Sequence, residues 1–152
     1  MLFIQKILVP VDFTDAALYA ARHAASLAQT YNARLYMLHV QAPFPLHGRV
    51  AAGFQENVQK HRIRKEQTEL SRVIPAAIKN TIAVEEIQVT GTPVYRVIVE
   101  KARQLKVDII VMASPQHRGW AHFFKKNITA QVIDNAPCSV FVLRPPEGSV
   151  DG

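Results

Sequence analysis

The stretch from Val107 to Thr129, VDIIVMASPQHRGWAHFFKKNIT, decides the fold of this chain. It opens with an apolar run, Val107–Met112, that only Asp108 interrupts. A short run of this kind predicts a strand buried on both faces, as in a parallel sheet. The segment 113–119 that follows is polar and irregular, and a helical pattern then ends near Asn135. A buried strand, a polar loop and a helix start form the place where open α/β sheets hold ligands.

The same alternation of strands and helices extends over the rest of the chain. Apolar runs predict strands at Lys6–Val11, Ala33–Val40, Ile82–Val89, Val107–Met112 and Ser139–Leu143. Helical spacing predicts helices at Ala16–Tyr31, at Gln55–Lys79 with a break near Pro75, from Pro93 to Lys106, and up to Asn135. Thr92 is the expected N-cap of the third helix, with Pro93 in its first position.

Strands and helices alternate regularly, and each connection is long enough for a right-handed crossover. The predicted fold class is therefore α/β, with a doubly wound, five-stranded parallel sheet covered by helices on both faces. Lys6–Val11 and Val107–Met112 are apolar on both faces and should be adjacent central strands. Glu85 and Glu86 predict an edge position for the third strand. Residues 1–145 should form one domain, and residues 146–152 a polar tail.

The bulk composition describes an ordinary globular chain of 152 residues, 49% hydrophobic and 20% charged. Its net charge of +6 permits an anionic partner, but the basic residues are scattered, which argues against nucleic acid. Lys60–Lys65 is interpreted as a solvated helix face.

No apolar run approaches the roughly 18 residues that span a bilayer, and no signal-peptide cleavage site follows the N-terminus. We expect a cytoplasmic protein in which Cys138, the only cysteine, is a buried and inert thiol.

The order and spacing of five motifs resemble the universal stress protein family over nearly the whole chain. They are KILVPVD at 6–12, LHV at 38–40, GTP at 91–93 followed by IVEKARQ, VDIIVMA at 107–113, and NAPCSVFVLRP at 135–145. The resemblance implies the strand order 3-2-1-4-5, in which Asp12 and the loop after Ala113 face one crevice. It also implies a homodimer through Ser139–Leu143, which would be an apolar edge strand in this order. The identity of any other protein partner is left open.

Many members of this family bind ATP through the motif G-x2-G-x9-G-[ST] after the fourth strand. Here the glycine positions fall on Ala113, Gln116 and Lys126, and the Ser/Thr position falls on Asn127. Forcing a non-glycine residue into the required conformation costs about 1–3 kcal/mol per site. Pro115 also removes one backbone N–H from the loop. At this loop the chain resembles the branch of the family that lacks the glycine motif and is not thought to bind ATP.

The other half of a nucleotide site is present in the sequence. By the resemblance, Asp12 corresponds to the residue that contacts base or ribose, Val40 lines the base pocket, and Met112 closes the fourth strand. A degenerate candidate site therefore comprises Asp12, Val40, Met112, Ala113, Gln116, Lys126, Asn127 and Ile128. The basic residues His117, Arg118 and Lys125 are candidate anion donors that would replace the missing amides, and the alternative is a solvated basic loop.

No catalytic or metal-binding pattern accompanies this site. The chain lacks the G-x-S-x-G elbow and the G-x-x-x-x-G-K-[ST] loop, and its six histidines show no metal-ligand spacing. The favoured hypothesis is a non-catalytic stress-response or regulatory dimer that acts through protein contacts and needs no cofactor. The alternative is an adenine-nucleotide switch of the same fold, binding ATP or AMP with an altered phosphate loop.

Overall fold

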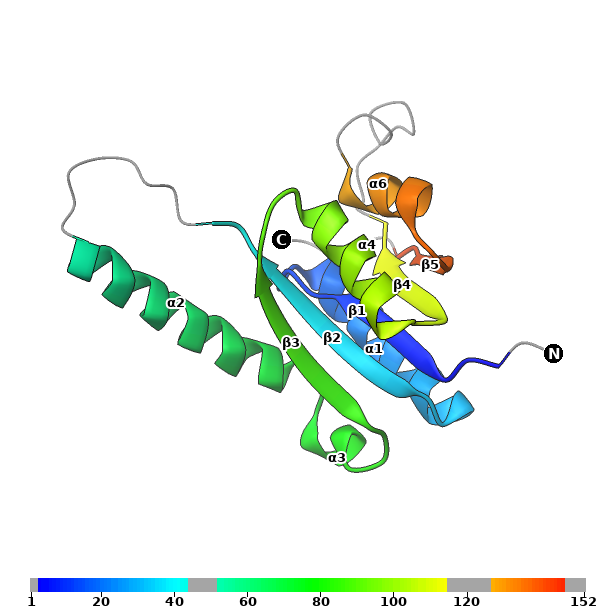
Figure 1. The fold of residues 1–152 in the computed structure, drawn as a ribbon. Coiled ribbons are helices and arrows are strands. Elements are labelled where there is room, and N and C mark those ends of the chain that lie inside the picture. The colour runs from blue at the N-terminus through cyan, green and yellow to red at the C-terminus, as the bar shows by residue number, and fades with distance from the viewer. Residues whose placement is uncertain (1–2, 44–51, 115–126, 147–152) are drawn as a thin grey trace.

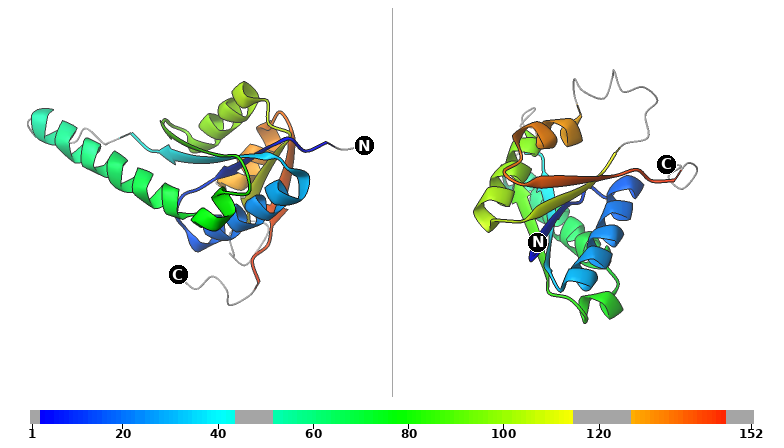
Figure 2. Two further views of the ribbon diagram at one scale, coloured as in Figure 1. Left: turned by 90° about the horizontal axis from the view of Figure 1, so that it is seen from below. Right: turned by 90° about the vertical axis from the view of Figure 1, so that its right-hand side faces the viewer.

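A computed structural model shows a parallel sheet between two layers of helices (Figure 1, Figure 2). The structure describes residues 3–43, 52–114 and 127–146. Its strands are β1 (Lys6–Pro10), β2 (Arg34–Gln41), β3 (Val84–Thr90), β4 (Ile109–Ala113) and β5 (Ser139–Leu143). They lie in the order β3-β2-β1-β4-β5, and every pairing is parallel. The predicted fold class, the central pair β1 and β4, and the edge position of β3 are confirmed.

The helices of the described segments are α1 (Asp15–Tyr31), α2 (Ala52–Arg72), α3 (Ala76–Lys79), α4 (Val94–Leu105) and α6 (Ile128–Asn135). The chain breaks between α2 and α3 at Pro75, as predicted, because proline cannot donate an internal helix hydrogen bond. The views in Figure 1 and Figure 2 place α1 on one face of the sheet and α4 with α6 on the other. The long helix α2 runs beside β3, and its N-terminal end extends past the sheet.

Successive side chains of β1 enter two separate cores because strand residues alternate between faces. Ile7 and Val9 are fully buried in the core on the α1 side. Leu8 is fully buried in the other core, together with Ile98 of α4 and Val132 of α6. On α1 the buried residues are all alanines, so this helix can lie close to the central strands.

Two predicted boundaries near β4 and α4 are wrong. β4 begins at Ile109 and not at Val107, because the Val107 N–H donates to the Ala102 carbonyl, at 3.1 Å, and thereby closes the end of α4. Thr92 does not cap α4, whose N-cap is Pro93 without a side-chain hydrogen bond. The Gly91 N–H, just after β3, donates to the carbonyl of Gln41 at the end of β2, at 3.0 Å. Because Gly91 is still bonded to the sheet, the helix begins one residue later than predicted.

Candidate ligand crevice

The carboxyl ends of β1 and β4 form the switch point of the sheet. These strands pair directly, with Ile7 opposite Ile109 and Leu8 opposite Ile110. After β1 the chain enters α1 on one face, and after β4 it leads to α6 on the other face (Figure 2). Connections that diverge in this way leave a crevice at the carboxyl edge, where open α/β sheets bind ligands.

Asp12 lies two residues after the end of β1 and is exposed at this edge. Its Oδ1 accepts hydrogen bonds from the Thr14 backbone N–H, at 3.1 Å, and from the Thr14 hydroxyl, at 2.6 Å. Thr14 Oγ1 in turn accepts from the Ala17 N–H, at 3.2 Å, and so caps α1. Among the described residues, the hydrogen bonds of the Asp12 side chain are the two that Oδ1 accepts from Thr14.

Val40 and Met112 lie on the same face of the sheet. Both belong to the core on the α4 side, where Met112 is 8% exposed and Val40 is half-buried. Ala113, the last residue of β4, packs instead against the core on the α1 side. Of the candidate residues on the strands, the structure therefore brings Val40 and Met112 to the same face and turns the side chain of Ala113 away from them.

The N-terminus of α6 lies beside the end of β4. Asn127 is its N-cap, with Oδ1 accepting from the Thr129 N–H at 2.9 Å. The buried Thr129 hydroxyl donates to the Ala113 carbonyl at 3.5 Å and ties the helix to β4, while Ile128 is 39% exposed. The remaining candidates, Gln116, His117, Arg118, Lys125 and Lys126, lie outside the described residues.

A buried polar cluster behind the crevice was missed by sequence reasoning. The His39 ring contacts the Val11 carbonyl through Nδ1, at 2.7 Å, and Glu66 Oε2 through Nε2, at 3.2 Å. Gln41 Nε2 donates to the same Glu66 oxygen, and Arg62 Nε donates to Oε1 at 3.0 Å. His39 and Gln41 occupy the same face of β2 as the fully buried Leu35 and Met37. Two polar residues on the core-facing positions of a strand were the signal that could have revealed the cluster.

The surroundings of Glu66 favour its charged form. Desolvation by burial alone would raise the pKa of this carboxyl group. Hydrogen bonds from Gln41 and Arg62, with the charges of His39 and Arg62, outweigh that effect and place the pKa below its ordinary value. Glu66 is therefore a carboxylate at neutral pH.

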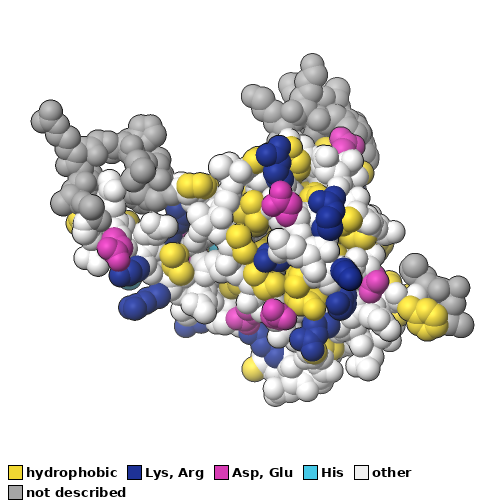
Figure 3. Space-filling view, in the orientation of Figure 1, with side chains coloured by type: hydrophobic (Ala, Val, Ile, Leu, Met, Phe, Trp, Pro, Cys, Tyr) yellow, Lys and Arg dark blue, Asp and Glu magenta, His cyan; other side chains and the backbone are white. Residues whose placement is uncertain are grey.

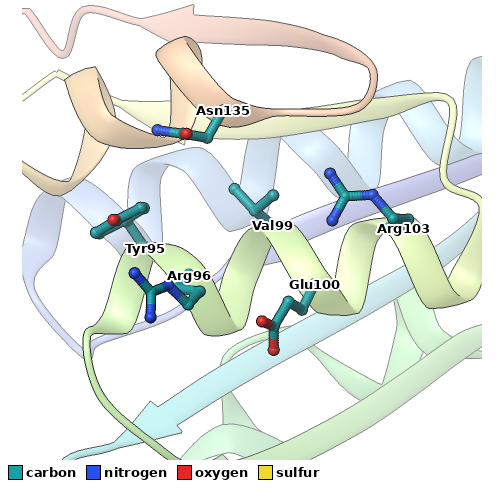
Figure 4. A pocket seen from close by; sticks show the side chains of 6 residues that line it. All are labelled: Tyr95, Arg96, Val99, Glu100, Arg103 and Asn135. Carbon is teal, nitrogen blue, oxygen red and sulfur yellow. The ribbon is translucent and has the colours of Figure 1, made fainter.

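A separate hollow of about 270 Å³ lies between α4 and α6 (Figure 4). Its lining residues are Tyr95, Arg96, Val99, Glu100, Arg103 and Asn135. Figure 4 shows Arg96 and Arg103 spaced along α4, with Val99 between them and pointing toward α6. Its charged lining residues are exposed, and no crevice candidate lines it. The hollow thus contains no buried polar group that would fix a ligand.

Elsewhere, the described parts of the chain contain no second candidate binding site. Figure 3 shows Lys and Arg side chains distributed over the face formed by α4 and interspersed with hydrophobic and acidic ones. Within residues 3–43, 52–114 and 127–146, no three His, Cys, Asp or Glu side chains gather as metal ligands, and no helix is long and apolar enough to cross a bilayer. Burial, together with the nearby Asp108 charge, raises the pKa of the half-buried Cys138 thiol, which disfavours the reactive thiolate.

The strand order and the helices on both faces define a doubly wound α/β protein whose switch point lies between β1 and β4. Residues 4–144 match the Universal stress protein family, and the chain belongs to this family.

Relatives and solved structures agree with this assignment. A universal stress protein of Methanocaldococcus jannaschii is 30% identical over 143 residues, which cover 94% of this chain and 84% of the relative. The solved universal stress protein UspA from Lactobacillus plantarum is 26% identical with a TM-score of 0.71, covering 95% of this chain and 100% of that one. A universal stress protein solved in complex with cAMP is 22% identical with a TM-score of 0.64, covering 95% of this chain and 100% of that one. At this identity the match supports the shared fold and nothing further.

Proposed function

We propose that this member of the universal stress protein family is a non-catalytic stress-response or regulatory protein that acts as a homodimer through protein contacts. The observation that carries the proposal is the β5 edge of the sheet. In the described part of the chain β5 pairs only with β4, so its other side presents unpaired backbone N–H and C=O groups. An exposed edge of this kind is a ready surface for a second chain.

The side chains of β5 support contact with a partner. Phe141 is 44% exposed and Val142 is 38% exposed, although both are apolar. Ile133 of α6, the helix that precedes β5, is 48% exposed as well. Exposed apolar side chains beside an unpaired strand favour burial against a second copy over exposure to water.

The missing phosphate cradle argues against tight ATP binding in the pose that uses the glycine motif. Ala113 ends β4 where that motif has its first glycine, and Asn127 already serves as the N-cap of α6. Gln116 and Lys126, at the other two glycine positions, carry side chains where backbone amides would have to approach phosphate.

An adenine-nucleotide switch is the second candidate function. It is favoured by the exposed Asp12 carboxylate and by the wall formed by Val40 and Met112, which resemble the base and ribose half of a nucleotide site. Solved structures of the same fold hold cAMP, AMP or dAMP. A nucleotide with few phosphates depends less on the glycine cradle than ATP does.

Two measurements on the purified full chain separate these functions. Sedimentation equilibrium should find a dimer at micromolar concentration. Calorimetric titration at physiological salt should find no micromolar binding of ATP. A monomer that binds ATP or AMP with micromolar affinity would contradict the regulatory dimer and favour the adenine-nucleotide switch.

A further inference from the structure

The two ring nitrogens of His39 link two segments that are distant in the chain. The ring is buried, with 7% of the residue exposed, and its nitrogens contact the Val11 carbonyl and the Glu66 carboxylate. Both partners are hydrogen-bond acceptors and cannot bond to each other, so the ring bridges them.

The His39 ring contacts the loop that carries Asp12. Val11, the residue before Asp12, accepts the hydrogen bond from His39 Nδ1. The ring of Phe13, the residue after Asp12, contacts the His39 ring in a tilted arrangement, with 4.6 Å between centroids. Phe13 also has a left-handed backbone, with φ of 64°, which a residue of this type adopts only when its surroundings hold it there. His39 thus contacts both neighbours of Asp12.

The Nε2 side of the His39 ring contacts α2. Glu66 lies in this helix, and Gln88 of β3 adds a hydrogen bond to the Ile63 carbonyl of the same helix, at 3.4 Å. Leu70, 1% exposed, is the buried apolar contact of α2, whereas Gly53 and Phe54 near its N-terminal end are exposed. The attachment of α2 to the sheet is therefore concentrated in its C-terminal half, around Glu66 and Leu70.

We propose that His39 is a positioning residue that couples the position of α2 to the loop carrying Asp12 through the contacts of its two ring nitrogens. Displacing α2, or removing the charge of Glu66, should loosen that loop. Two charged side chains lie around the contact between His39 and Glu66: Glu66 itself and Arg62, both on α2. The neighbouring Gln41 of β2 and Gln88 of β3 are uncharged. The inference goes beyond the proposed function and does not require that the crevice bind a nucleotide.

Amide hydrogen exchange tests the coupling. The Thr14 N–H, bonded to Asp12, reports the loop, amides at 66–70 report α2, and the Ile110 region of β4 is the internal reference. Glu66→Gln should accelerate exchange at the loop and at α2 by about tenfold or more, with β4 nearly unchanged. The matched control is Glu69→Gln, which removes only a surface pair with Lys65 at 4.0 Å and should leave both sites within about twofold. Faster exchange in α2 alone, or equally fast exchange everywhere, would show that His39 does not couple the two elements.

Discussion

His39 Nε2 lies 3.2 Å from Glu66 Oε2, and the two side chains are only 8% and 16% exposed. The pair joins the second strand of the sheet to a helix 27 residues further along the chain. Burying this carboxylate is tolerable because Gln41 and Arg62 donate to it as well. Replacing the carboxylate by an amide leaves only one acceptor oxygen and no negative charge for these donors, which makes the pair a sensitive point for stability.

The first prediction concerns Glu66 and pH. Because the folded protein lowers the pKa of Glu66, its carboxylate stabilises the fold above the unfolded-state value of about 4.3, and this contribution is lost as pH falls through the folded value. Glu66→Gln should lower the free energy of unfolding at pH 7 by about 1–3 kcal/mol. The difference from wild type should shrink toward pH 3 in urea titrations. Glu69→Gln, on the same helix, should show little difference at either pH, and a Glu66→Gln deficit that persists unchanged in acid would contradict the assignment.

The second prediction compares two glycines. A Cβ at Gly91 would lie 2.7 Å from Cγ2 of Val97, and valine has little freedom to move aside. Gly91→Ala should therefore destabilise the fold by about 1–3 kcal/mol, as overpacking usually does. Gly53, in the first turn of α2, has nothing within 4 Å of its added Cβ, so Gly53→Ala should be neutral or stabilising by up to about 1 kcal/mol. Thermal unfolding of both variants checks the contrast, and equal effects would refute it.

The third prediction concerns the dimer. Val142→Lys places a charge on the β5 edge, where an apolar side chain is 38% exposed, and should shift the protein to monomer at micromolar concentration. Phe54→Lys is the control, because Phe54 is 63% exposed on α2, away from β5. Light scattering should separate the two. A dimer unaffected by Val142→Lys would place the interface elsewhere.

The fourth prediction concerns the phosphate loop. The variant Ala113→Gly, Gln116→Gly, Lys126→Gly and Asn127→Ser should gain ATP binding that the native chain lacks. Serine keeps the N-cap of α6, so this helix should stay in place. If the strain of about 1–3 kcal/mol per replaced site roughly adds, the gain should exceed a hundredfold in calorimetric titration. Asn127→Ala in the same background removes the cap and should bind more weakly. Native binding as tight as that of the glycine variant would disprove the role assigned to the glycines.

The sequence by itself determined most of the fold. Apolar runs such as Val107–Met112 could only be buried between two helical layers, and Pro75 required a break between α2 and α3. The order β3-β2-β1-β4-β5 was implied by the family resemblance and not by the apolar pattern itself. The resemblance also selected Asp12, Val40 and Met112, which lie at or just after the carboxyl ends of adjacent strands.

Only the tertiary structure decided which polar side chains meet. His39 and Gln41 occupy core-facing positions of an apolar strand, but their partner Glu66 is one of several glutamates on a polar helix, and nothing local distinguishes Glu66 from the others. The same holds at residue 92, where Thr92 and Pro93 suit a helix start, yet the pairing of Gly91 with Gln41 across the sheet delays it. Local patterns report how a residue relates to its neighbours in the chain. Hydrogen bonds between distant segments depend on the packing of a helix against a sheet edge, which no short stretch of sequence encodes.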